Sequence, residues 1–214
     1  YIYFAVDGAI RMKQLIADLL EYSRAGNKAG ELADNDMNDV VDEVLNVLRV
    51  AIKEAQASIL CNPLPVLPNT RRTQLVQLLQ NLIGNALKYR GSNKPEICID
   101  AIENEHDWVL AVKDNGIGFE STNAERIFDV FQRLHNADKY SGTGIGLSIC
   151  KKIVERHEHD VKNGATITLE KYVSKQHKGR NVTYEKTKST YYCTTNRDAN
   201  YWRLFDKQFP RAVK

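Results

Sequence analysis

Three glycines in five positions, Gly142, Gly144 and Gly146, stand at the start of a segment with the pattern of a helix, residues 145–157. The first amides of a helix have no partner within it and carry the positive end of its dipole, so a flexible loop at this point is typical of phosphate binding. A Walker loop is excluded because Leu147 follows Gly146 where a lysine is required. The dinucleotide fingerprint is excluded as well, because its glycines are spaced differently and follow a strand. The loop alone is therefore a weak indication of function.

The composition is that of an ordinary globular protein. The chain has 214 residues, of which 43% are hydrophobic and 27% are charged, and its net charge is +3. This charge is too small to indicate nucleic-acid binding, and no apolar run is long enough to cross a membrane. The four cysteines lack metal-ligand spacing, which favours a reduced setting over a zinc site. We expect a cytoplasmic protein with one substantial domain and an appendage.

Periodicity predicts the main secondary-structure elements. Helices are expected from the opening segment to Arg24, and over residues 37–55, 73–89, 124–131 and 145–157. Strands are expected over residues 96–102, 108–114 and 164–170, and the prolines of residues 61–69 predict an extended connection.

Two further segments carry polar groups in suggestive places. In the helix over residues 73–89, Asn81, Asn85 and Lys88 share one stripe with two glutamines, beside an apolar arc. Asp114 ends a predicted strand and is followed by "NGIGF", so that its carboxylate could accept a hydrogen bond from an exocyclic amine while the backbone passes close to a flat ring. Each segment has an ordinary alternative, namely a solvated helix face and an Asp-Asn-Gly turn.

The order of the segments changes this assessment. "QNLIGNALKYR", "DNGIGF", "IFDVFQRLH" and "GTGIGLSICKKIVERH" occur once each, in that order. They resemble the N box, the first glycine box, the phenylalanine box and the second glycine box of bacterial sensor histidine kinases. These kinases belong to the wider group of gyrase, heat-shock protein 90, histidine kinase and mismatch-repair ATPases. The resemblance covers residues 1–157.

The resemblance implies a fold and a domain organisation. The expected fold is a two-layer α/β sandwich of the Bergerat type, in which a mixed sheet packs on helices and ATP lies between the helices under a lid. It would occupy residues 30–170. Residues 1–26 are similar to the second helix of the dimerisation and phosphotransfer hairpin, truncated here, and residues 171–214 match nothing in the family. The family continues after its last box with two strands, for which residues 158–170 are too short, so either the sheet is completed irregularly or the tail is foreign.

The resemblance also implies roles for the N box and the first glycine box. Asn85 should coordinate Mg²⁺ bridging the phosphates, and Asn81 should support the metal or a phosphate. Lys88 should reach the phosphates, and Tyr89 should line the pocket. Asp114 should accept from the adenine amino group, with Gly116 and Gly118 allowing the backbone to approach.

The lid and its return complete the implied site. The return should present amides to phosphate from Gly142, Thr143, Gly144, Gly146 and Leu147. Arg133 and Lys139 should be lid cations that stabilise charge on the transferred group. Phe128 and Phe131 should anchor the lid rather than touch ATP.

The implied activity is transfer of the γ-phosphate of ATP to a histidine in two-component signalling. The implied partners are the phosphoacceptor helix of the parent kinase, a response-regulator receiver domain and a second copy in a homodimer. None of the five histidines has the context of a phosphoacceptor, so we expect the chain to bind ATP without labelling itself. A gyrase-type ATPase is one alternative, but such enzymes place a glutamate on the N-box helix, where this chain has Gln80 and Asn81. A non-catalytic nucleotide-binding module is the other.

Overall fold

The computed structural model describes residues 2–25, 30–103, 108–119, 123, 126–134, 140, 142–160 and 167–170. Along the chain, the elements are α1 (Ile2–Ala25), β1 (Ala33–Asp36), α2 (Met37–Val47), α3 (Arg49–Ala55), β2 (Ser58–Cys61), β3 (Val66–Thr70), α4 (Arg72–Lys88), β4 (Glu96–Glu103), β5 (Trp108–Asp114), the 3₁₀ turn η2 (Arg126–Phe128), α5 (Gly146–Asp160) and β6 (Ile167–Glu170).

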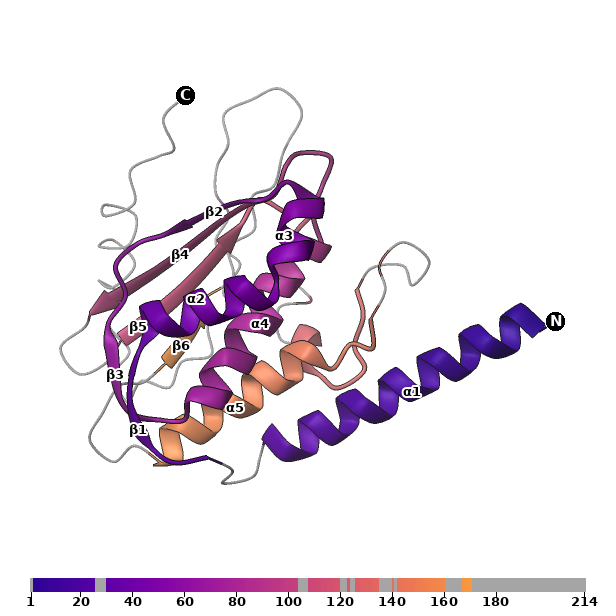
Figure 1. Cartoon of the computed structure of the whole chain (residues 1–214). Helices are drawn as coiled ribbons and strands as arrows, with labels where there is room; N and C mark the ends of the chain where they lie inside the picture. The colour runs from indigo at the N-terminus through magenta and orange to yellow at the C-terminus, as the bar shows by residue number, and fades with distance from the viewer. Residues whose placement is uncertain are drawn as a thin grey trace.

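Four of the described strands form a mixed sheet covered on one face by helices (Figure 1). Its four strands lie in the order β2-β4-β5-β6, with β4 antiparallel to β5 and both edge strands parallel to their neighbours. Helices α2, α4 and α5 form the second layer, and β1 pairs with β3 in a separate two-stranded ribbon. The predicted two-layer α/β fold is thereby confirmed.

The core lies between α4, α5 and the sheet. Because strand side chains alternate between faces, Ile97, Ile99, Leu110 and Val112 all point toward the helices. Residues at helical spacing on α4 meet them, and they are fully or almost fully buried: Leu75, Leu78, Leu79, Ile83 and Ala86. This packing fixes the carboxyl end of α4 beside the carboxyl end of β5.

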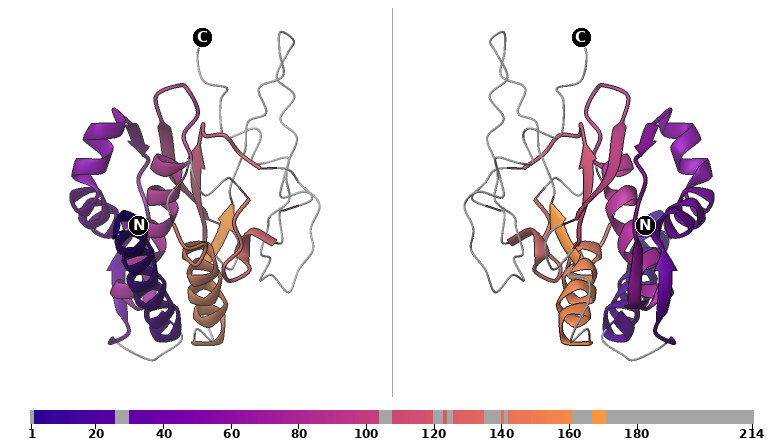
Figure 2. Two further views of the ribbon diagram at one scale, coloured as in Figure 1. Left: turned by 90° about the vertical axis from the view of Figure 1, so that its right-hand side faces the viewer. Right: turned by 90° about the vertical axis from the view of Figure 1, so that its left-hand side faces the viewer.

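Helix α1 runs beside α5 (Figure 2). Eight of its large apolar side chains, from Ile2 to Leu20, are exposed, whereas its last residue, Ala25, is buried. None of the described helices combines the length and apolar character needed to cross a lipid bilayer.

Several predicted elements differ from the structure. The helix expected over residues 37–55 breaks at Leu48, whose ψ of 4° interrupts the regular backbone between α2 and α3. The helix expected over residues 124–131 is described only as the 3₁₀ turn η2, and strand β6 pairs with β5 over the end of the segment predicted as a strand. Strands β1 and β2 were not predicted.

Replacing Leu78 by Ala tests the α4 packing. Leu78 is 0% exposed, so the cavity should lower the free energy of unfolding by about 2–5 kcal/mol. Leu60→Ala is the matched control, because Leu60 is 60% exposed, and it should change that free energy by less than about 0.5 kcal/mol. Urea unfolding followed by circular dichroism measures both, and equal losses would contradict the packing.

Cys150 tests the contact between α5 and α4. Burial raises the pKa of its thiol to about 12, so roughly one thiol in ten thousand is ionised at pH 8. In the native chain at pH 8, iodoacetamide should therefore modify the exposed Cys61 before Cys150, although burial also raises the pKa of the Cys61 thiol. Cys150 should react only after urea is added, as peptide mass spectrometry would show. Equal native rates would mean that α4 does not cover Cys150.

Candidate functional site

The loop after β5 is tied to the end of α4. The amide of Ile117 donates to the carbonyl of Tyr89 at 2.9 Å, and the amide of Gly116 donates to Asp114 Oδ1 at 2.9 Å. A Cβ at Gly116 would lie 2.5 Å from the Tyr89 oxygen, so only glycine lets the loop pass this close. Asp114, Gly116 and Gly118 are thus brought to the end of the helix that carries Asn81, Asn85 and Lys88.

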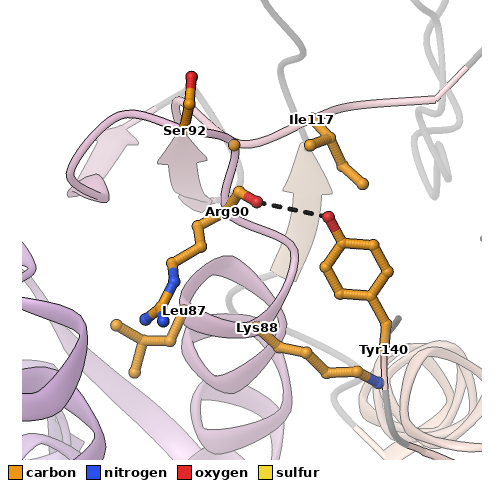
Figure 3. A pocket seen from close by; sticks show the side chains of 7 residues that line it. Leu87, Lys88, Arg90, Ser92, Ile117 and Tyr140 are labelled. Carbon is orange, nitrogen blue, oxygen red and sulfur yellow. Dashed lines mark hydrogen bonds between the residues drawn. The ribbon is translucent and has the colours of Figure 1, made fainter. Parts of the chain in front are cut away.

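A cavity of about 660 Å³ opens at this junction, within the range of ligand pockets (Figure 3). Its lining residues are Leu87, Lys88, Arg90, Gly91, Ser92, Ile117 and Tyr140. Of the predicted site residues only Lys88 is among them, whereas Tyr89 and Asp114 adjoin the lining without forming part of it. The role of Tyr89 in lining the nucleotide pocket therefore stays a prediction.

Tyr140 and Arg90 were missed by the sequence analysis. The Tyr140 hydroxyl donates to the Arg90 carbonyl at 3.5 Å, as Figure 3 shows, and its ring lies 5.2 Å from that of Tyr89 at 45°. The available signal was their position next to motifs, since Arg90 follows Tyr89 directly and Tyr140 stands two residues before Gly142. Tyr140 thus contributes an aromatic ring to the lining of the cavity, and the Tyr89 ring lies against it.

Lys88 lies between the end of α4 and the glycine loop, which we define as residues 142–146. Its Nζ is 2.9 Å from the Tyr89 hydroxyl and 4.4 Å from the centre of the Tyr89 ring. A Cβ at Gly142 would lie only 2.4 Å from the same nitrogen. The structure therefore places one cation against the first glycine of the loop.

The rest of the glycine loop packs between α4 and residues 131–133. A Cβ at Gly146 would lie 2.8 Å from Asn81 Oδ1, and one at Gly144 would lie 2.7 Å from the Gln132 carbonyl. Gly146 and Leu147 are the first two residues of α5, so its unpaired amides start beside Asn81. The Thr143 hydroxyl donates to the Asp18 carboxylate of α1.

Asn85 and Asn81 lie one turn apart on α4. The Asn81 amide nitrogen donates to the Gln77 carbonyl at 3.0 Å, whereas the side chain of Asn85 makes no hydrogen bond to another residue that the structure describes. Asn85 is half-buried, so its carboxamide is available to a ligand. Within the described ranges there is no cluster of three or more His, Cys, Asp or Glu side chains that could hold a metal.

The residues predicted for the lid differ in where the structure places them. Arg133 donates to the Tyr140 carbonyl, so its guanidinium holds lid backbone in this structure. Lys139 lies outside the described residues. Phe128 is buried, as expected for an anchor, whereas Phe131 is 55% exposed and has a φ of 66°, so its role as an anchor stays a prediction.

Comparison with known proteins identifies one family. The sequence matches the family described as histidine kinase-, DNA gyrase B-, and HSP90-like ATPase over residues 70–189. It is 44% identical to cyanobacterial phytochrome A of Nostoc sp. over 172 residues, which are 78% of this chain and 22% of the phytochrome. It is 31% identical to the sensor protein kinase WalK of Staphylococcus epidermidis over 152 residues, which are 69% of this chain and 25% of that kinase. The chain thus spans about a fifth to a quarter of the length of these relatives.

Solved structures have the same fold. The nucleotide-free catalytic domain of the histidine kinase ThkA matches with a TM-score of 0.51 and 26% identity, over 59% of this chain and 81% of that domain. Full-length ShkA in complex with AMPPNP matches with a TM-score of 0.57 and 24% identity, over 71% of this chain and 32% of ShkA.

Replacing Gly142 by Ala tests the geometry of the glycine loop. The new methyl would meet Lys88, and the φ of 137° is strained for any residue with a Cβ, so the free energy of unfolding should fall by about 1–3 kcal/mol. Gly84→Ala is the matched control. Gly84 lies inside α4 with nothing within 4 Å of a Cβ, so that substitution should raise the same free energy by about 0.5–1 kcal/mol. Urea unfolding gives both values, and a stabilised Gly142→Ala variant would overturn the loop geometry.

Proposed function

The chain belongs to the family of histidine kinase-, DNA gyrase B- and HSP90-like ATPases, within which it is a sensor histidine kinase catalytic domain, and we propose that it binds Mg-ATP and transfers the γ-phosphate to a histidine on a partner helix. One observation carries the proposal. The end of α4 and the loop after β5 meet at one cavity, and Lys88, which lines this cavity, also lies against Gly142 of the glycine loop.

The base of ATP would enter on the side of the β5 loop. In the proposal, Asp114 accepts a hydrogen bond from the adenine amino group, and its carboxylate is already oriented by the Gly116 amide. Ile117 and Tyr140 offer apolar and aromatic surface in the neighbouring cavity wall. Gly118 continues the loop with a positive φ of 64°.

The phosphates would lie toward the glycine loop. Lys88 supplies a positive charge there, and the first amides of α5, at Gly146 and Leu147, supply donors at a helix N-terminus. Asn85 fits a Mg²⁺ ligand, because Mg²⁺ prefers oxygen and is bound mainly through phosphates and waters with few protein ligands. Asn81 would orient the same groups. When bound, the ion would neutralise charge that develops on the transferred group.

The residues present favour transfer over hydrolysis. Helix α4 carries no acidic residue, so it has no carboxylate to activate water. Phosphoryl transfer requires mainly positioning and charge neutralisation, for which the cavity is equipped. Arg133 would then act by holding the lid at Tyr140, whereas a role of Lys139 on the transferred group stays a prediction.

We further propose that the chain works as a homodimer and serves a response-regulator receiver domain. Helix α1 supports the first part, because a helix that exposes a large apolar surface is expected to be covered. Its exposed apolar residues are Ile2, Val6, Ile10, Met12, Leu15, Ile16, Leu19 and Leu20. ThkA supports the second part as a protein of the same fold solved in complex with the response regulator TrrA, with a TM-score of 0.54 and 22% identity over 77% of this chain and 48% of ThkA.

Calorimetric titration with AMPPNP, with and without Mg²⁺, tests the site. Asn85→Ala should abolish the gain in affinity that Mg²⁺ gives, and Asp114→Ala should weaken binding about 10- to 100-fold under both conditions, as expected for a hydrogen bond to a charged group. Asn46→Ala is the matched control, since Asn46 is exposed on α2.

Two results would contradict the proposal. Unchanged affinity in Asp114→Ala would displace the adenine from the β5 loop. A wild-type chain that is folded by circular dichroism and binds no AMPPNP would make the fold a non-catalytic module instead.

A further inference from the structure

The last turns of α1 are fastened to the catalytic domain. The hydrogen bonds of this connection include those from Thr143 to the Asp18 carboxylate, from Gln77 to Glu21 at 2.7 Å, from Lys152 to the Tyr22 carbonyl at 3.0 Å and from Gln74 to the Ala25 carbonyl at 3.4 Å. The Lys152 amine also lies 4.2 Å from the centre of the Tyr22 ring. Helix α1 is therefore placed by several independent contacts along one side of α4 and α5.

Asp18 differs from the other members of this set. The other three contacts reach the bodies of α4 and α5, whereas Asp18 reaches the glycine loop at Thr143. Its second oxygen accepts from Gln14 of its own helix at 2.7 Å, so the carboxylate is oriented from both sides. The Thr143 hydroxyl is thereby committed to α1, whereas the resemblance implied a phosphate contact only from the amide of this residue.

The position of this carboxylate has an electrostatic consequence. The N-terminus of α5 begins at Gly146, three residues after Thr143, and favours a negative charge. Without nucleotide, Asp18 supplies negative charge near that end. With nucleotide bound as proposed, the same carboxylate would lie near the phosphates, and like charges at short range in a partly buried site repel one another.

We propose that Asp18 is a positioning residue of the nucleotide site, contributed by α1, which holds the glycine loop through Thr143 and opposes the phosphates by its charge. The inference rests on the proposed function, because it requires ATP phosphates at the loop. By thermodynamic linkage, nucleotide binding and the docking of α1 then weaken each other by the same factor. The site is therefore coupled to the helix that precedes it.

The test compares Asp18→Asn with Glu21→Gln in the full chain. Both substitutions remove one negative charge from α1 and keep an oxygen that can accept a hydrogen bond, but only Asp18 touches the glycine loop. In calorimetric titrations with Mg-AMPPNP at low salt, Asp18→Asn should bind on the order of tenfold more tightly than the wild type, within the usual range for coupled sites. Glu21→Gln should change the dissociation constant by less than about twofold. The difference should shrink at high salt, because screening weakens the repulsion.

Hydrogen exchange supplies the reciprocal measurement. Saturating Mg-AMPPNP should speed amide exchange in residues 14–25 of the wild type and should do so less in Asp18→Asn. A purely structural contact would change stability without changing either readout.

The outcomes separate this inference from the proposed function. If the wild type binds Mg-AMPPNP and the two variants shift affinity alike, or Asp18→Asn binds no more tightly, Asp18 has no special role and the proposed function stands. If a folded wild type binds no nucleotide, both are overturned.

Discussion

One backbone hydrogen bond, from the Ile117 amide to the Tyr89 carbonyl, joins the helix layer to the sheet layer where the cavity opens. Helix ends leave carbonyl groups without partners, and a loop that leaves a strand has amides in the same condition. Here the Ile117 amide and the Tyr89 carbonyl satisfy each other, because the core holds the end of α4 beside the end of β5. Gly116 permits this contact, and the contact in turn sets the distance between Asp114 and Lys88. The geometry of the candidate site thus depends on packing that lies beneath it.

Helix α4 serves the core and the site at once, and its helical period separates the two tasks. Leu78, Leu79 and Ile83 face the sheet, whereas Asn81, Asn85 and Lys88 follow one edge toward the glycine loop. Because both sets are on one rigid helix, a shift of α4 on the sheet would move every polar group of that edge together. Such placement on a regular element holds side chains more exactly than a loop would.

The strongly periodic elements could be predicted from the sequence, and elements created by distant pairing could not. α4, β4, β5 and α5 lie within a few residues of their predicted positions because their apolar residues repeat at the helix or strand period. Strand β1 reads Ala-Asp-Asn-Asp and has no such pattern; it exists because Asn35 bonds to Thr70, 35 residues further along the chain. The site residues divide in the same way, into those that sequence motifs indicate and those that only the tertiary fold brings together. The box motifs indicated Lys88 and the glycines, but the Tyr140–Arg90 contact and the bond from Thr143 to Asp18, 125 residues away in sequence, depend on the tertiary fold.

The absence of acidic residues from α4 also affects how much ATP the protein would consume in a cell. An enzyme that activates water hydrolyses ATP continuously, whether or not an acceptor for the phosphoryl group is present. Under the proposed function, this chain would hold its nucleotide without turning it over, since nothing on that helix prepares water for attack. Its ATP consumption would then depend on the number of encounters with an acceptor histidine and not on elapsed time. A cell could therefore keep many inactive copies and consume little ATP.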